Sequence, residues 1–184
     1  MRKFLFSVLA FLTLTGCSLN VSDLDNTPTK KVEAYLNDYQ SLNDGVLEDL
    51  DMVIEKEESF TGDAKDRYKE VMKSNFEDLT YTVKDETVNG DTATVEVEID
   101  VTDFYKVIKA SEDYKEQHAN EFNDESGNYD DNKYIDYKLK QMENTSDRVK
   151  HTIYFTLTKD KNGNWELDDV DESEEEKILG MYAY

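Results

Sequence analysis

The alternation of apolar and polar residues around Asn89-Gly90 constrains the fold more than any other feature of the sequence. Residues 92–101 place an apolar side chain at every second position, and residues 79–83 do the same before the turn. Alternation of this kind is typical of half-buried strands, and Asn-Gly is the strongest short signal for a β-hairpin. A similar run at 149–157 is followed by the turn DKNGN and a short run at 165–170. The sequence therefore predicts two antiparallel hairpins.

Runs with helical spacing surround both hairpins. Thr27-Pro28 combines a good N-cap with a proline suited to the first turn, and apolar stripes follow between residues 32 and 76. The helical period returns over about 103–146, and Ser173 with Glu176 forms a capping box before a short closing helix. This order predicts an α+β fold, with N-terminal helices packed on a curved antiparallel sheet of two long hairpins and a helical insert between the hairpins. The insert either projects from the sheet or covers its open side.

The N-terminus has the composition of an export signal. Arg2 and Lys3 precede an apolar run of about a dozen residues, whereas a membrane span needs ~20. The run ends in a segment that resembles a bacterial lipobox, made of Leu14, Thr15, Gly16 and Cys17. The resemblance implies that the signal is cut before Cys17 and that the Cys17 thiol carries a diacylglycerol.

These features divide the chain into three parts. Residues 1–16 are the expected lipoprotein signal peptide, 17–27 a lipidated tether, and 28–184 a single α+β, cone-like domain. We expect the protein to lie at the extracytoplasmic face of the cell membrane, held there by acyl groups on Cys17, such as palmitate, that form its lipid anchor. Cys17 is the only cysteine, so the folded part contains no disulfide.

The chain is strongly acidic. Its net charge is −22, and removal of Arg2 and Lys3 with the signal makes it −24. Such a surface repels phosphate backbones and anionic lipid headgroups. We therefore expect no nucleic-acid partner, and we expect the folded part to stand away from the membrane.

Several segments together resemble known families. They are TPTKKVEAYLNDYQ, NFEDLTYTVKDETVNGDTATVEVEI and TIYFTLTKDKNGNWELDDV. With the lipobox, they resemble uncharacterised lipoproteins of low-GC Gram-positive bacteria, and the order of elements is similar to the cone fold of nuclear transport factor two and its relatives. The resemblance implies a cell-surface lipoprotein. Cone-fold relatives include enzymes and binding modules, so the fold does not choose between these functions.

The two histidines are the only catalytic candidates. His118 lies on an apolar stripe, and His151 shares its side of a strand with Ile153 and Phe155, so both are expected to face the interior. Tyrosine apart, His151 is the one titratable strand residue that we place on the inward face. It would be the general base of an isomerase- or hydratase-type enzyme, whereas packing in the core is the alternative. The sequence contains no phosphate-binding glycine loop, nucleophile elbow or His-Glu-x-x-His motif, and we expect no enzyme activity.

An acidic segment at 85–96 approaches the pattern of a calcium-binding EF-hand loop. Asp85, Asn89, Gly90 and Glu96 fall on four of its key positions. A strand follows where the motif requires a helix, so the segment is interpreted as a hairpin. We expect no metal and no cofactor.

The 12 tyrosines and 8 phenylalanines mostly follow the apolar stripes. Four tyrosines fit the interior less well and could form a recognition surface: Tyr134, Tyr137, Tyr182 and Tyr184. The sequence thus predicts a non-enzymatic binding or interaction module for a small apolar ligand, a wall component or an envelope protein. A scaffold for a neighbouring transporter or wall enzyme is a further alternative.

Overall fold

The structure is a computed structural model that describes residues 26–57 and 59–184. The predicted signal peptide and lipobox, including Leu14, Thr15, Gly16 and Cys17, lie outside the described residues, as does most of the tether. None of the helices in the described part of the chain is long and apolar enough to cross a membrane.

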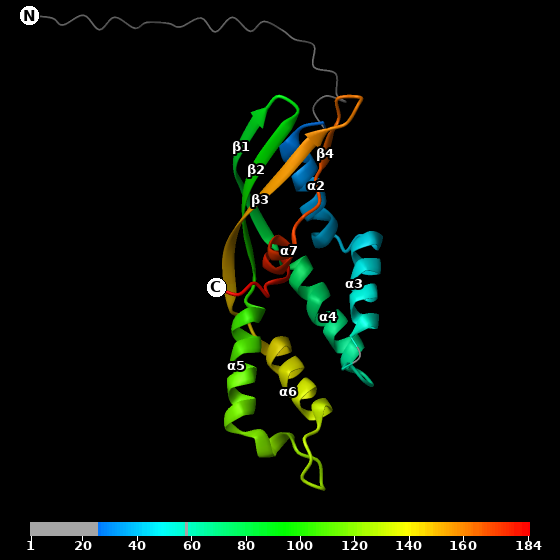
Figure 1. Ribbon diagram of the computed structural model, residues 1–184, viewed down its shortest axis with the longest axis vertical. Helices are drawn as coiled ribbons and strands as arrows, with labels where there is room; N and C mark the ends of the chain where they lie inside the picture. The colour runs from blue at the N-terminus through cyan, green and yellow to red at the C-terminus, as the bar shows by residue number, and fades with distance from the viewer. Residues whose placement is uncertain (1–25, 58) are drawn as a thin grey trace, which may run out of the picture.

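Groups of helices and antiparallel strands follow one another along the chain in the predicted order (Figure 1). Three helices come first: α2 (Pro28–Gln40), α3 (Asp44–Lys56) and α4 (Ala64–Glu77). The first hairpin, β1 (Thr80–Asn89) and β2 (Thr92–Thr102), leads into α5 (Phe104–Gln117), the short 3-10 helix η1 (Ala119–Phe122) and α6 (Asp131–Asn144). The chain ends with β3 (Arg148–Lys159), β4 (Trp165–Leu167) and α7 (Glu172–Leu179). The predicted α+β class is confirmed.

The four strands form one open sheet in the order β1-β2-β3-β4, with every neighbouring pair antiparallel. The sheet is not closed into a barrel. The prediction of two long hairpins is right for β1 and β2 but wrong for the second hairpin, because β4 has only three residues. The acids that follow Leu167 disfavour a strand, and Asp168 donates its backbone N–H to Thr156 O as the chain turns toward α7.

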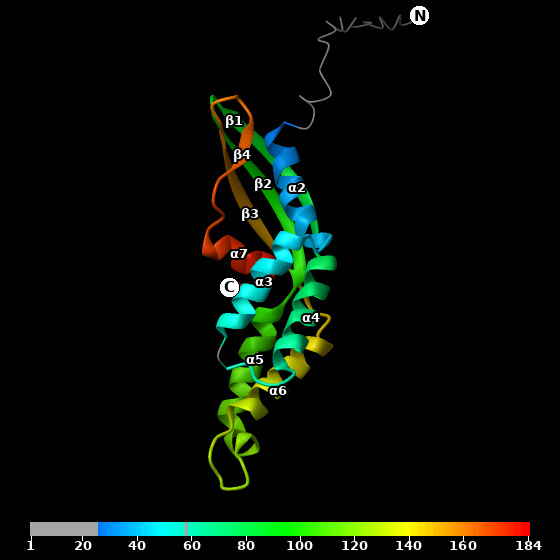
Figure 2. The ribbon, with the colours of Figure 1, turned by 90° about the vertical axis from the view of Figure 1, so that its right-hand side faces the viewer.

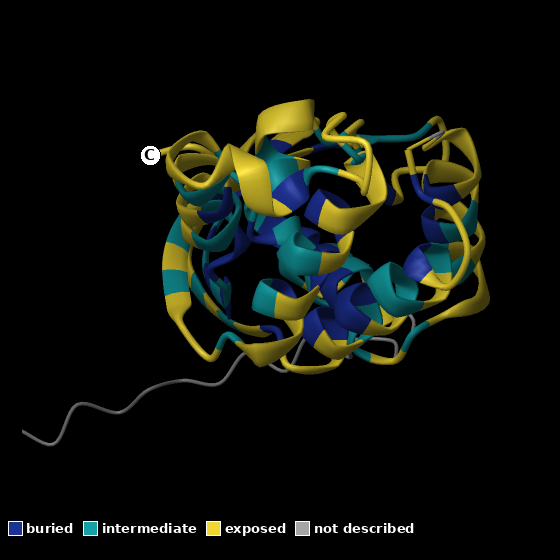
Figure 3. Cartoon of the chain, turned by 90° about the horizontal axis from the view of Figure 1, so that it is seen from below, coloured by how far each residue is buried: buried dark blue, intermediate teal, exposed yellow. Residues whose placement is uncertain are grey.

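Two apolar clusters hold the molecule together. The first lies between the sheet, α2 and α7, and includes Leu36, Val97 and Ile153. The second is built from the helices and the loop between α3 and α4, and it includes Met72 of α4 and Leu139 of α6. Figure 3 shows buried residues on the facing surfaces of the helices and exposed residues outside them. The expectation that the N-terminal helices pack on the sheet therefore holds for α2, while α3 and much of α4 pack in the helical cluster.

The insert projects from the sheet rather than covering it. Helices α5 and α6 lie side by side and extend beyond one end of the sheet (Figures 1 and 2). The described chain begins at the opposite end, where Asn26 Oδ1 accepts a hydrogen bond of 2.9 Å from Trp165 N in the second hairpin. The molecule is consequently elongated, with its first described residue and its helical arm at opposite ends.

The N-cap of the closing helix α7 lies two residues earlier than the sequence predicted. Thr27 caps α2 as predicted, since its side chain accepts from Lys30 N. In α7, however, Asp171 is the N-cap, and its carboxylate accepts from Glu174 N at 3.0 Å. Ser173 lies inside the helix and donates to Asp171, so the predicted Ser173–Glu176 box is wrong. The carboxylate is also favoured over a hydroxyl by the positive end of the helix dipole.

A β-bulge changes which residues of β1 face the helices. The register shifts between Val83 and Asp85, so that Glu86 lies opposite the fully buried Val95. Cross-strand partners share a face, and Glu86 reaches the start of α2, where Oε2 accepts from Thr29 N at 3.0 Å and from Thr29 Oγ1 at 2.6 Å. His151 is therefore not the only titratable strand residue on this face.

Candidate binding grooves

His118 does not face the interior, contrary to expectation. It is the C-cap of α5, because the helix ends at Gln117 and the chain turns into η1. Its side chain is 44% exposed, and Nδ1 lies 3.2 Å from Glu121 Oε1. The ring stacks on Tyr114 with centroids 4.2 Å apart. The helix that carries the apolar stripe ends one residue before His118, so the helical spacing no longer applies to it.

His151 occupies the predicted face of β3, opposite Ile99. The residue is half-buried, and Nε2 is buried without a hydrogen-bond partner. Its ring meets the edge of Tyr182 at a centroid distance of 5.6 Å. Burial lowers the pKa of His151, and the positive charge of Lys177 lowers it further, against weaker opposing effects of Asp103 and Glu174. The imidazole is thus favoured in its neutral form.

Among the described residues, no carboxylate forms the hydrogen bond to His151 that would orient it as a general base. Of the two acids that raise the pKa of His151, Asp103 has the larger effect. Both of its carboxylate oxygens are already bound, however, because Oδ2 accepts from the Tyr184 hydroxyl at 2.7 Å and Oδ1 accepts from Lys106 N. His118 lies on the arm, so the two histidines form no common site. His151 does not line the grooves described below, nor two others in the described part of the chain.

The four tyrosines expected at the surface do not form one recognition surface. Tyr134 is only 9% exposed, because Phe122 packs edge-on against its ring and Lys115 Nζ lies 4.3 Å from the ring centre. Tyr137 stacks on Tyr114 within the arm. Tyr182 and Tyr184 lie at the other end of the insert, against His151. The expectation was wrong for Tyr134 and right for the exposed Tyr184.

The predicted hairpin interpretation of residues 85–96 is confirmed, since Asp85 and Glu96 are cross-strand partners in β1 and β2. Within residues 26–57 and 59–184, no group of three or more His, Cys, Asp or Glu side chains is placed to hold a metal ion.

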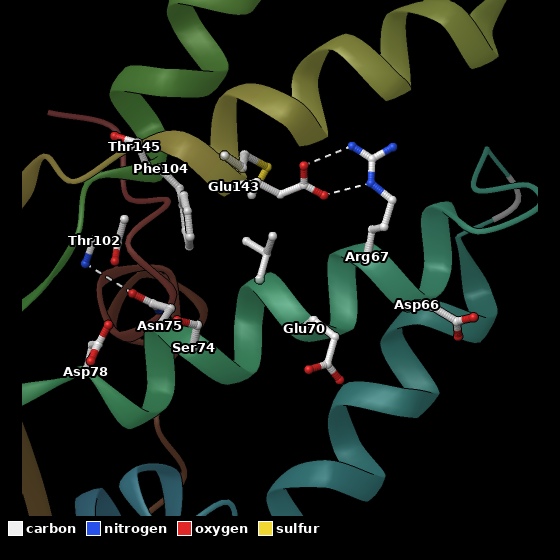
Figure 4. Close-up of a pocket in the computed structure, with 12 residues that line it drawn as sticks. Asp66, Arg67, Glu70, Ser74, Asn75, Asp78, Thr102, Phe104, Glu143 and Thr145 are labelled. Carbon is white, nitrogen blue, oxygen red and sulfur yellow. Dashed lines mark hydrogen bonds and ion pairs between the residues drawn. The ribbon is translucent and has the colours of Figure 1, made fainter.

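A polar groove of about 440 Å³ lies between α4 and α6 (Figure 4). Its one arginine, Arg67, is bound by Glu143 at 2.6 Å and Asp136 at 2.5 Å. The amide of Asn75 accepts from Thr102 N at 3.0 Å and donates to the end of α7. Arg67 and Asn75 thus already have protein partners, and the ion pairs of Arg67 join α4 of the body to α6 of the arm.

A more apolar groove of about 320 Å³ lies beside α3, and we call it the α3–α4 groove. Helix α3 lies between α4 and α7 in the view of Figure 2. Residues of α2, α3, α4 and α7 line the groove: Tyr39, Val46, Asp49, Leu50, Met52, Val53, Lys56, Tyr68, Met72, Phe76, Glu175 and Leu179. Met52 is 46% exposed and Val53 is 60% exposed. Large apolar side chains at the margin of an apolar hollow are typical of a binding surface.

The sequence did not predict this groove, because Val46, Leu47, Leu50, Val53 and Ile54 follow helical spacing and were interpreted as one apolar stripe. Leu50 and Ile54 are buried as predicted, whereas Val53 points out. The run Val46 to Ile54 carries more apolar residues than one helix face can bury, and Met52 lies outside the stripe. That excess is the signal in the sequence that could have indicated an exposed apolar surface.

The groove continues into an acidic one of about 440 Å³, which shares Tyr39, Val46, Asp49 and Glu175 with it. Five carboxylates surround this part, and we call them the acidic lip: Asp38, Asp49, Asp168, Asp169 and Glu175. The hydroxyls of Tyr35 and Tyr39 are 3.2 Å apart beside the lip. Burial raises the pKa of Tyr35 above its usual value, and the negative charges of Glu175 and Asp49 add to the effect.

Comparison with known proteins gives little further information. No protein-family model matches the chain, and no curated protein matches it. A search of solved structures returns the crystal structure of a predicted lipoprotein (ycdA) from Bacillus subtilis, with 15% sequence identity and a TM-score of 0.41. The match covers 89% of this chain and 50% of that chain, so this chain spans about half the length of the matched structure. At this level of similarity we draw no conclusion about function from the match.

Proposed function

We propose that the protein is a lipoprotein, anchored by acyl groups on Cys17 at the extracytoplasmic face of the cell membrane, and that it acts there as a non-enzymatic binding module. The observation that carries the binding function is the α3–α4 groove, with Met52 and Val53 exposed at its margin. Its volume of about 320 Å³ lies in the range of ligand sites, and methionine adapts readily to different apolar partners. The expected ligands are small apolar molecules, or apolar groups of a wall component or envelope protein.

The anchor is supported by the sequence Leu14-Thr15-Gly16-Cys17 and by the shape of the molecule. The described chain starts at Asn26, at the end of the molecule opposite the arm (Figure 1). The segment from Cys17 to Asn26 spans about 30 Å when extended. An anchor at Cys17 would therefore leave the grooves and the arm accessible from outside, and the acidic surface would keep the body off anionic lipids.

Metabolic labelling with an alkyne fatty acid tests the anchor. The full chain is expected to incorporate the label and to partition into the detergent phase of Triton X-114, while Cys17→Ala does neither. Ser22→Ala, which keeps the thiol, serves as the control. Membrane retention and labelling of the Cys17→Ala variant would refute the lipid anchor.

Thermal unfolding of the full chain in phosphatidylcholine nanodiscs tests the groove. Hexyl glucoside, muropeptides and lipoteichoic acid are added in turn, because a ligand that binds only the native state raises the melting temperature. Val53→Glu is expected to abolish the rise by placing a charge at the groove margin. The control Val88→Glu alters a valine of comparable exposure (50%) in the first hairpin, and it should still show the rise in melting temperature. If no compound raises the melting temperature, or if Val53→Glu behaves like Val88→Glu, the groove is not the site.

A second candidate is an isomerase- or hydratase-type enzyme with His151 as general base. The observation in its favour is the buried Nε2 without a partner. Turnover of any substrate by the full chain that is lost in His151→Phe would support this candidate over the binding module.

A scaffold for a neighbouring transporter or wall enzyme is a third candidate, and the projecting arm of α5 and α6 favours it. Loss of a co-purifying partner when residues 105–144 are deleted would support the scaffold.

The relationship to lipoproteins of low-GC Gram-positive bacteria and to the cone fold of nuclear transport factor two is likewise a proposal. It is supported by the order of helices before an antiparallel sheet. The open sheet, which α2 covers in part, is compatible with a shallow cone.

A further inference from the structure

We propose that the α3–α4 groove and its acidic lip dock a basic amphipathic peptide segment of another envelope protein. The proposal rests on the binding function proposed above and names the class of partner for the same groove. Such a segment places large apolar side chains on the groove floor and Lys or Arg side chains at the lip. The argument depends on three features: a continuous apolar surface, an unneutralised set of carboxylates beside it, and the net charge of the chain.

The apolar surface and the lip form one continuous site. Tyr39, Val46, Asp49 and Glu175 line both hollows, so a ligand on the floor lies next to the carboxylates. The floor is closed below by Met72 and Phe76 of the helical cluster, which are both buried. Apolar helix faces that dock in grooves of this kind use side chains three or four residues apart.

The lip has little to neutralise it. Among the described residues, none of its five carboxylates lies within ion-pair distance of a lysine or arginine. Asp38 accepts from the Asn43 amide and Asp168 from the Thr158 hydroxyl, and both donors are neutral. Lys56 is the single cation that lines the adjoining apolar groove. The hollow therefore complements positive charge, and such complementarity both selects partners and speeds association.

The aromatic pair at the lip strengthens the preference for cations. Tyr35 and Tyr39 meet edge to face, with ring centroids 5.4 Å apart, beside Asp49 and Glu175. Tyrosine rings attract Lys and Arg side chains, most of all where water is excluded. Burial and the neighbouring Tyr39 hydroxyl raise the pKa of Tyr35, and the charges of Glu175 and Asp49 add a smaller effect in the same direction.

Net charge separates this partner from other occupants. A second copy of the chain, at −22 overall, would bring like charge to the lip. Anionic lipids and wall polymers rich in phosphate are repelled for the same reason. A neutral apolar ligand would fill the floor but leave the lip unused. A basic amphipathic segment uses both parts of the hollow.

Three synthetic peptides of 14 residues test the proposal on the full chain in phosphatidylcholine nanodiscs. They share one leucine pattern at helical spacing, and the remaining positions are Lys, Gln or Glu. Binding is followed by fluorescence anisotropy of labelled peptide, with empty nanodiscs as the blank. We expect the Lys peptide to bind at least tenfold more tightly than the Gln peptide, and the Glu peptide to bind most weakly. The preference should shrink as salt rises, because salt screens exposed charges.

A matched pair of double variants separates the lip from the general acidity of the protein. Asp49→Asn with Glu175→Gln removes two lip charges at nearly constant shape, and neither side chain makes a hydrogen bond or ion pair in the described structure that would be lost. Asp85→Asn with Glu96→Gln removes two charges from a cross-strand pair on the first hairpin. The lip variant is expected to weaken the Lys peptide about tenfold, from two surface charge pairs of typical strength. The hairpin variant should weaken it less than twofold.

The outcomes distinguish this inference from the function on which it rests. Equal loss in both double variants, or equal binding of the Lys and Gln peptides, overturns the inference of a basic partner. If hexyl glucoside raises the melting temperature in a Val53-dependent manner while no peptide binds, the binding function stands and the peptide inference fails. If none of the three compounds raises the melting temperature and no peptide binds, both fail.

Discussion

Asn75 is the buried polar residue through which α4, the end of β2 and the end of α7 are connected. The residue is 2% exposed. Its Oδ1 accepts from Thr102 N at 3.0 Å, and its Nδ2 donates to Ile178 O and Leu179 O at 3.4 Å each. Replacement by alanine leaves the N–H of Thr102 without this partner, which costs about 1–3 kcal/mol for a buried donor. The two long bonds and the small void add less, so Asn75→Ala should lower the free energy of unfolding by about 2–3 kcal/mol.

Asn75→Asp provides a sharper version of the same test. The carboxylate keeps the acceptor for Thr102 N, but it cannot donate to Ile178 O and Leu179 O, and it places a charge at a buried position beside these carbonyls. At pH 7 the variant should therefore be less stable than Asn75→Ala, since an uncompensated buried charge costs about 3–5 kcal/mol. Burial should raise the pKa of the new carboxyl above the ordinary value of about 3.9.

The sign of the pH dependence follows from that raised pKa. Where the folded state holds the proton more tightly than the unfolded state, stability is present at low pH and is lost as pH rises through the folded pKa. Asn75→Asp should therefore approach Asn75→Ala at pH 4.5 and fall below it at pH 7. Urea unfolding of the full chain, followed by circular dichroism at both pH values, measures the difference. A cost below about 1 kcal/mol for both variants, with no pH dependence, would refute the role assigned to Asn75.

Three further predictions test the fold. Gly180→Ala should lower the free energy of unfolding by about 2 kcal/mol or more, because the residue has φ +71° and an added Cβ would lie 1.9 Å from Thr102 O. The control Gly127→Ala has φ +84° but no atom within 4 Å of the added Cβ, so it should cost about 1 kcal/mol. Urea midpoints that rank the two variants the other way would contradict this. His151→Phe should remove a loss of stability that the native chain shows as pH falls below 6.5, since the lowered pKa of His151 makes its protonation unfavourable in the folded state; identical pH profiles of unfolding would exclude this. Leu139→Ala should cost about 2–5 kcal/mol, as Leu139 is fully buried in the helical cluster, and a loss below 1 kcal/mol in thermal and urea unfolding would show that the cluster is loosely packed.

Local patterns predicted the elements well. The Asn89-Gly90 turn, the alternation of β2 and the Thr27 cap of α2 all lie where the sequence placed them. Each of these depends on residues close together in the chain. The errors occur where a residue's environment comes from elsewhere: His118 leaves the apolar face because α5 ends at Gln117, and Glu86 changes face because β1 bulges against β2.

The candidate site was less accessible to sequence reasoning. Tyr39, Asp49, Phe76 and Glu175 come from four helices, and nothing in their spacing along the chain indicates that they meet. The excess of apolar residues in α3 was the one local sign of an exposed surface.

The sequence by itself therefore determined the order and type of the elements, the acidic character and the expected lipid anchor at Cys17, because periodicity, turn chemistry and targeting signals are local properties. Only the tertiary structure decided that the insert projects, that Asn75 joins segments about a hundred residues apart, and that an apolar groove meets an acidic lip beside α3. Those features depend on which helix faces come together, and that is determined by packing between distant segments of the chain.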